Sequence, residues 1–138
     1  MKTTDLQIGQ ALPALATGPI TRLRIVKYTH GSGDLNPIHV DPDFAREKAG
    51  LPDVIVHGMY SMGMLSRLLA RWAGPASVRS IDTRFAAMLP VHASLVCEGV
   101  VQAIEPVDGG AQVTVMLTAS REDGSSIASG TALVFVRD

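Results

Sequence analysis

An aspartate and a histidine on either side of a proline are the residues of this chain best suited to chemistry. Residues 33–39 read GDLNPIH, which places the carboxylate of Asp34 five residues before the imidazole of His39. A residue before proline is pushed out of the α region and proline has no N–H to donate, so the Asn36-Pro37 pair excludes a helix interior. The two side chains therefore meet only if an irregular loop joins them, and such loops often carry catalytic groups. The alternative is a plain turn in which Asp34 and Asn36 bond to nearby backbone groups.

Composition limits what kind of protein carries this loop. The 138 residues are expected to form one domain, residues 1–138, with a full hydrophobic core. Hydrophobic residues make up 46% and charged residues 18%, which argues against disorder. The formal net charge of −1 predicts neither nucleic-acid binding nor an acidic tail. Cys97 is the only cysteine, which excludes an internal disulfide. Without an apolar run of signal-peptide or membrane-spanning length, we expect a cytoplasmic protein with no membrane association.

Short helices are predicted on both sides of the loop. Residues 7–20 are punctuated by glycines and prolines that break any long element. Thr21 fits as the N-cap of a helix that runs to about Thr29, although the alternation there also fits a strand. The expected inward side of this helix is apolar and consists of Leu23, Ile25 and Val26. After the loop, residues 42–50 read PDFAREKAG, a small helix with proline in its first turn and glycine at its end.

The strongest helix signal covers residues 57–72, HGMYSMGMLSRLLARW. Apolar residues cover most of its first half, which predicts a helix buried on nearly all sides. Four β-rich runs follow, separated by turn residues: 78–88, 93–103, 111–119 and 126–136. The third alternates apolar and polar residues, as a sheet with two unlike faces requires. One long helix followed by these strands predicts an α+β fold in which an antiparallel sheet wraps around a long central helix.

Three segments resemble the MaoC-like dehydratase family, which contains the (R)-specific enoyl-CoA hydratases and the β-hydroxyacyl-ACP dehydratases of the mycobacterial type. Residues 32–41, SGDLNPIHVD, resemble its hydratase-2 motif, and residues 56–59, VHGM, resemble the start of its central helix. Arg84-Phe85 and residues 89–91, LPV, resemble the strand and turn that follow. The resemblance extends in order from about residue 5 to the C-terminus. It implies a hotdog fold and a dimer, with a homodimer expected and a heterodimer as the alternative.

The same resemblance implies roles for individual residues. Asp34 and His39 fall on the family's catalytic aspartate and histidine, and Gly58 falls where a backbone N–H serves the thioester oxygen. Asn36 is expected to hold the loop in place, or else to satisfy local backbone as a turn asparagine. Ser66 falls where some relatives carry a serine near the reacting thioester and others a glycine.

These residue types suit the addition of water to an acyl thioester. A carboxylate and an imidazole can bind one water and supply both proton transfers, while a helix N-terminus favours the negative charge that develops on the thioester oxygen. The predicted function is therefore the (R)-specific hydration of 2-enoyl thioesters, or the reverse dehydration of 3-hydroxyacyl thioesters, on CoA or ACP in fatty-acid or polyketide-type metabolism. A noncatalytic acyl-thioester-binding subunit of a hotdog heterodimer is the alternative. A thioesterase comes last, since the fold alone does not settle the function.

The polar residues also allow two other roles, a second catalytic base and a metal site. His57 could act as a second base, but orienting the loop or packing near Asp34 is the expected role. Carboxylate and imidazole are also suitable metal ligands, and Asp34, His39, Asp41 and His57 could be drawn as such a site. Their spacing matches no metal motif, so neither a metal nor another cofactor is predicted.

Overall fold

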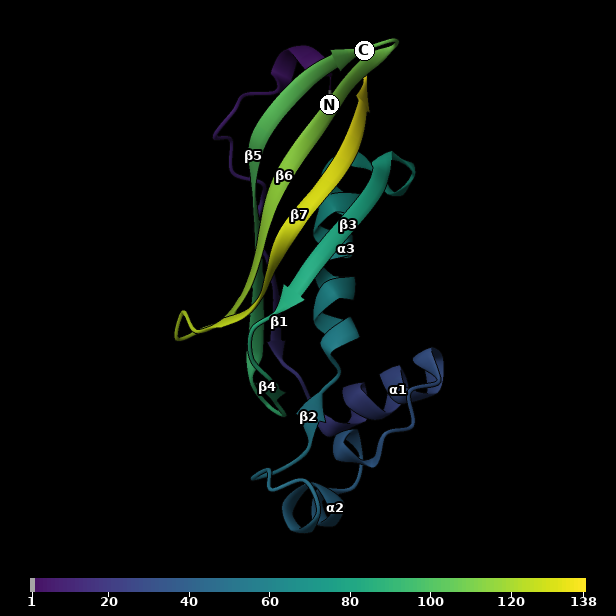
Figure 1. The fold of residues 1–138 in the computed structure, drawn as a ribbon, viewed down its shortest axis with the longest axis vertical. Coiled ribbons are helices and arrows are strands. Elements are labelled where there is room, and N and C mark those ends of the chain that lie inside the picture. Colours follow the sequence, from purple (N-terminus) through teal and green to yellow (C-terminus); the bar gives the residue numbers. More distant parts are fainter. Residues whose placement is uncertain (1) are drawn as a thin grey trace.

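The computed structural model describes residues 2–138 and contains one long antiparallel sheet with a helix along one face (Figure 1). The strand order is β1-β5-β6-β7-β3. The strands are β1 (Leu15–Pro19), β3 (Val78–Phe85), β5 (Ser94–Val107), β6 (Gly110–Arg121) and β7 (Ser126–Arg137). The central helix α3 (Gly58–Ala73) contacts β3, β5, β6 and β7. The predicted α+β arrangement, a sheet around one long helix, is confirmed.

The meander β5-β6-β7 follows from its sequence. Asp108-Gly109 joins β5 to β6, and Gly109 adopts φ +74°, a left-handed conformation that glycine adopts without strain. Along β6 the inward positions alternate as predicted, and the fully buried side chains are Val113, Val115, Leu117 and Ala119. The alternation therefore gives the sheet one face for the core and one for solvent.

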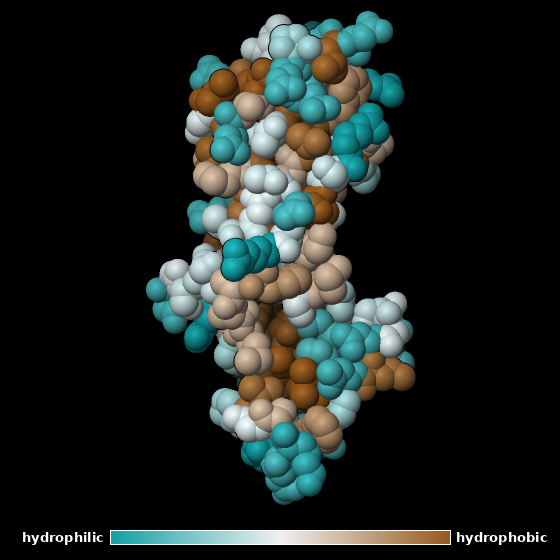
Figure 2. All heavy atoms as spheres, viewed as in Figure 1, coloured by the Kyte–Doolittle hydropathy of each residue, from teal (hydrophilic) through white to brown (hydrophobic). Residues whose placement is uncertain are grey.

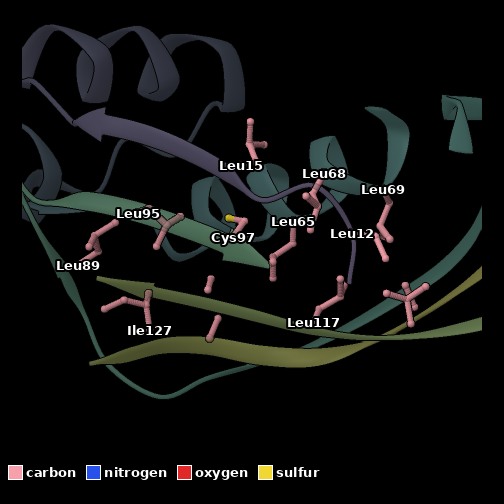
Figure 3. Close-up of a cluster of buried hydrophobic side chains, with 14 of the residues drawn as sticks. Leu12, Leu15, Leu65, Leu68, Leu69, Leu89, Leu95, Cys97, Leu117 and Ile127 are labelled. Atoms are coloured by element: carbon pink, nitrogen blue, oxygen red, sulfur yellow. The ribbon is translucent and has the colours of Figure 1, made fainter. Parts of the chain in front are cut away.

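The hydrophobic core lies between the sheet and α3 (Figure 3). Leu65, Leu68 and Leu69 of α3 are buried against sheet residues such as Leu95 and Leu117. Full burial of each such leucine stabilises the fold by about 1.5–3 kcal/mol. The opposite side of α3 is exposed, for example at Gly63 and Arg67, so the prediction of a helix buried on nearly all sides was wrong. The sheet covers only one face of the helix.

Short elements gather at the N-terminal end of α3 (Figure 1). They are α1 (Arg22–Ser32), the 3-10 turn η2 (Pro37–His39), α2 (Pro42–Glu47) and the strand β2 (Ile55–Val56), which pairs with β4 (Leu89–Pro90). Two further 3-10 turns are η1 (Thr3–Asp5) and η3 (Pro75–Ser77). No helix within residues 2–138 is long and apolar enough to cross a bilayer.

The helices that flank the loop begin where the sequence predicts. The hydroxyl of Thr21 accepts a hydrogen bond from the backbone N–H of Arg24 and caps α1. The expected inward side of α1 was only partly right: Ile25 is buried, whereas Leu23 is 63% exposed and Val26 is also exposed. Because α1 lies at the end of the molecule, other elements cover only the narrow side of the helix that carries Ile25 and Thr29.

Three strands, β1, β2 and β4, were not predicted. Residues 15–19, which lie where no long element was expected, form β1 and pair with β5, with a register shift between Ala16 and Pro19. That irregularity removes the alternation by which a strand is recognised. The predicted strand 78–88 ends at Phe85, and Leu89–Pro90 pairs with β2 instead.

Candidate active site

Hydrogen bonds between side chains and backbone N–H groups of the same loop hold the segment that carries Asp34. Gly33 ends α1 in the left-handed region with φ +75°, where glycine carries no steric penalty. The Asp34 carboxylate accepts a hydrogen bond from the N–H of Asn36 at 3.2 Å. The Asn36 side chain in turn accepts one from the N–H of Ile38 at 3.2 Å and caps η2, which ends at His39. In this structure the Asn36 side chain satisfies local backbone, which is the turn role given above as the alternative.

The tautomer of His39 follows from its buried partner. His39 is 6% exposed, and its Nδ1 lies 2.8 Å from the carbonyl oxygen of Ile55 on β2. A carbonyl can only accept, so Nδ1 carries the proton and Nε2 of the neutral ring keeps a free lone pair. This Nε2 lies 3.7 Å from Oδ2 of Asp34, whose side chain is 51% exposed. The separation is too long for a hydrogen bond between them, but one water beside both atoms can bond to each.

A second imidazole supports the first. His57, the residue before α3, is buried, and its ring stacks on His39 with centroids 3.7 Å apart. Its Nε2 lies 3.3 Å from the hydroxyl of Thr29 and 3.4 Å from the carbonyl oxygen of Asp34. Burial, and then the neighbouring His39, lower the pKa of His57 below its ordinary value, which favours the neutral ring. These contacts agree with an orienting role.

An apolar cavity of about 350 Å³ lies beside His39. Its walls come from β2, the first turn of α3, residues 85–89 and Ile127. Figure 2 shows hydrophobic atoms gathered on this face of the molecule, at the level of β2 and β4 in Figure 1. Gly58, the first residue of α3, borders the cavity, and a Cβ at this position would meet the ring of Phe85 at 3.4 Å. The N–H at a helix start has no intrahelical partner, so a ligand in the cavity can accept a hydrogen bond from it.

Ser61 is a site residue that the sequence reasoning missed. It lines the cavity one turn after Gly58, is 1% exposed, and its hydroxyl has no hydrogen-bond partner among residues 2–138. Ser66, the serine that the resemblance suggested, is half-buried on α3 and does not line this cavity. The spacing held a signal: residues three and four apart share a helix face, so Ser61 lies on the face of His57 and Gly58.

Three of the four residues considered for a metal site do lie together. Ligand atoms of Asp34, His39 and His57 are all within 4.8 Å of one another. Asp41 lies apart from them, and its carboxylate caps α2 by accepting from the N–H groups of Asp43 and Phe44. In His39 the Nδ1 is engaged with backbone, as is the Nε2 of His57. Of these three side chains, the Asp34 carboxylate and Nε2 of His39 are the groups whose positions would let them bind one water between them.

The sequence of this chain matches a family model described as the MaoC like domain over residues 4–122. The chain belongs to the MaoC-like domain family. Two relatives of this domain come from Mycobacterium tuberculosis. The 3-hydroxyacyl-thioester dehydratase Y is 44% identical over 57 residues, which are 39% of this chain and 20% of that protein. The 3-hydroxyacyl-thioester dehydratase X is 38% identical over 107 residues, which are 75% of this chain and 34% of that protein. The MaoC-like domain therefore aligns with only a fifth to a third of the length of these relatives.

Solved structures share the fold of this MaoC-like domain. The R-hydratase PhaJ1 from Pseudomonas aeruginosa superposes with a TM-score of 0.87 at 22% identity, over 99% of this chain and 86% of that one. At this identity the likeness concerns the fold, and it confirms the hotdog architecture.

Proposed function

We propose that this MaoC-like domain catalyses the (R)-specific hydration of 2-enoyl thioesters and the reverse dehydration of 3-hydroxyacyl thioesters. The observation that carries the proposal is the pair formed by the Asp34 carboxylate and His39 Nε2, 3.7 Å apart beside an apolar cavity and the start of α3. The relatives named above are dehydratases of 3-hydroxyacyl thioesters, which supports this reaction class.

Asp34 and His39 are proposed to act jointly on one water. The bond from His39 Nδ1 to the Ile55 carbonyl keeps the Nε2 lone pair available, and the ionised Asp34 carboxylate can only accept. As the water oxygen bonds to C3, one member of the pair takes a water proton, and the pair then delivers that proton to C2, so that H and OH of the same water are added across the double bond. Acid–base help of this kind is typically worth about 10²–10⁴ in rate. Dehydration follows the same steps in reverse.

Gly58 is proposed to stabilise the charge on the thioester oxygen. Addition of water at C3 shifts electron density onto that oxygen, and the N–H and dipole at the start of α3 favour it there. Loss of one such donor costs about 2.7–4 kcal/mol in a well-studied enzyme. The apolar walls of the cavity, among them Ile55, Leu89 and Ile127, suit the acyl chain.

The test is turnover of crotonyl-CoA, followed by the loss of absorbance of its conjugated double bond. Hydration that yields only the (R)-3-hydroxy product supports the proposal, and a chelator should leave the rate unchanged. Free thiol released from a saturated acyl-CoA would indicate a thioesterase instead. Binding of enoyl thioesters of several chain lengths without any turnover would indicate the noncatalytic subunit. A homodimer and a cytoplasmic location stay predictions from the sequence.

A further inference from the structure

A second cavity borders a different face of α3 and is lined by arginines. It measures about 330 Å³ and lies between β1, α1 and α3, whereas the apolar cavity is bordered by β2, β4 and β7. The guanidinium groups at its edge belong to Arg24 of α1 and to Arg67 and Arg71 of α3. We call this cavity the basic groove.

The segments that line the basic groove carry arginines and no carboxylates of their own. The chain has a net charge of −1, yet residues 6–33 and 54–81, which supply β1, α1 and α3, contain no aspartate or glutamate. Within the described part of the chain, neither Arg67 nor Arg71 forms an ion pair, in contrast to Arg22, Arg46 and Arg121. Clustered cations without partners attract anions into a concave site.

The chemistry of the basic groove favours phosphate. A guanidinium presents its N–H donors in a planar fork that matches phosphate oxygens. The Nη1 of Arg24 donates to the backbone carbonyl of Thr17 at 3.1 Å, which fixes that side chain at the groove while its other donors stay available. Arg67 and Arg71 lie four residues apart, so they project from the same side of α3.

A chain of ring contacts connects the basic groove to the candidate active site. Tyr60 lines the groove, and its ring meets Tyr28 edge-on at 5.4 Å between centroids. Tyr28 in turn lies 4.8 Å from the ring of His57, which stacks on His39. The two sites are thus linked through the first turns of α3, and a ligand with a reactive thioester at one end and phosphates at the other end of a long flexible arm is the kind that two such sites would suit.

We infer that the basic groove binds the phosphate groups at the nucleotide end of a coenzyme A thioester. This inference rests on the proposed function and adds the carrier to it: the substrates are CoA thioesters, and Arg67 and Arg71 contribute to their affinity without touching the reacting atoms.

The kinetic test compares two double variants that change the net charge equally. Arg67→Glu/Arg71→Glu reverses the groove, and Arg121→Glu/Arg137→Glu lies at strand ends outside it. For crotonyl-CoA the groove variant should raise KM by about tenfold or more with kcat within about twofold of wild type, since remote binding is lost. For crotonyl-pantetheine, which has no phosphate, wild type and both variants should give the same KM. An unchanged KM for crotonyl-CoA in the groove variant, or equal increases in both variants, would overturn the inference.

A binding test separates this inference from the proposed function. Isothermal titration with adenosine 3′,5′-bisphosphate needs no turnover. Wild type and the Arg121→Glu/Arg137→Glu control should bind it, and the groove variant should bind about tenfold more weakly or not at all. If this pattern appears in a protein that hydrates nothing, the groove stands and the proposed function fails. If wild type hydrates crotonyl-CoA but does not bind the bisphosphate, the function stands and the groove assignment fails. If Arg67→Glu/Arg71→Glu raises KM only for enoyl thioesters on acyl carrier protein and not for crotonyl-CoA, the groove assignment also fails.

Discussion

The two ends of α3 differ in what they bury. Around its second half the sheet packs leucines and valines, and the buried groups are almost entirely apolar. At its start, where α1, η2 and β2 meet, the chain buries polar side chains: Thr29, His39, His57 and Ser61. Ser94 is the one other buried polar residue in the described part of the chain. An unsatisfied buried polar group costs about 1–3 kcal/mol, so apolar burial in the core half offsets the cost of the polar groups buried at the end that holds the candidate active site.

The largest effect should separate the two ends cleanly. Asp34→Asn and His39→Gln remove the proposed acid–base groups of the candidate active site, and we expect kcat/KM for crotonyl-CoA to fall by about 10²–10⁴. The Asp34 side chain is half exposed, so the free energy of unfolding should change by less than about 0.5 kcal/mol in Asp34→Asn. Urea denaturation checks the second point. A near-normal rate in either variant removes that residue from the mechanism.

The reverse effect is expected in the core half. Leu65→Ala leaves a cavity against the sheet and should lower the free energy of unfolding by about 2–5 kcal/mol. At temperatures and urea concentrations well below its unfolding transition, this variant should keep the kcat of wild type, because Leu65 does not line the apolar cavity beside His39. Leu23→Ala, at an exposed leucine on α1, is the matched control and should change stability by less than about 0.5 kcal/mol. Equal losses in both variants would mean that the core is misassigned.

The buried His57 should make stability depend on pH. Its pKa is lowered in the folded state, so below the ordinary value of 6.5 the unfolded chain binds more protons than the folded one. The free energy of unfolding should therefore fall as the pH drops through 6.5 toward the folded-state pKa, and be fully retained above 6.5. Urea titrations between about pH 7.5 and 5.5 should show a steeper decline for wild type than for His57→Gln. Parallel curves would show that His57 titrates normally.

The smallest effect concerns the Ser61 hydroxyl, which has no hydrogen-bond partner among residues 2–138. Ser61→Ala removes a buried polar atom without a partner and adds helix propensity, so stability should rise by up to about 1 kcal/mol. We expect kcat/KM to fall severalfold, because Ser61 lines the cavity next to Gly58. Ser66→Ala, on the same helix but away from that cavity, is the control and should leave kcat/KM unchanged. A loss of stability in Ser61→Ala would contradict the absence of a partner.

Where local chemistry decides the structure, the sequence predicted it. Three such features depend only on neighbours in the chain, and all three appear in the structure. They are the Thr21 cap, the turn between the second and third β-rich runs, and the alternation of β6. The loop around Asn36-Pro37 was expected to be irregular for the same reason. The approach of the Asp34 carboxylate to the His39 ring was suggested by the family resemblance alone. In the structure the His39 ring is positioned by β2, a strand of two residues that is too short to show any periodicity.

Where packing between distant segments decides, the sequence was insufficient. Leu23 and Val26 are apolar but exposed because α1 sits at the end of the molecule. β1 joins the sheet with an irregular register, which hides its alternation. Ser61 lies in an apolar stretch that predicts core, and only the cavity beside it distinguishes it from Ser66.

The proposed chemistry requires that Asp34 and His39 act together on one water. The direct measurement is a double-mutant cycle on kcat/KM for crotonyl-CoA, with Asp34→Asn, His39→Gln and the combined variant. Residues that act as a unit show strongly non-additive losses, so the double variant should lose no more than about the worse single variant. Losses that multiply in the double variant would show that the two residues act independently, and would contradict the shared water.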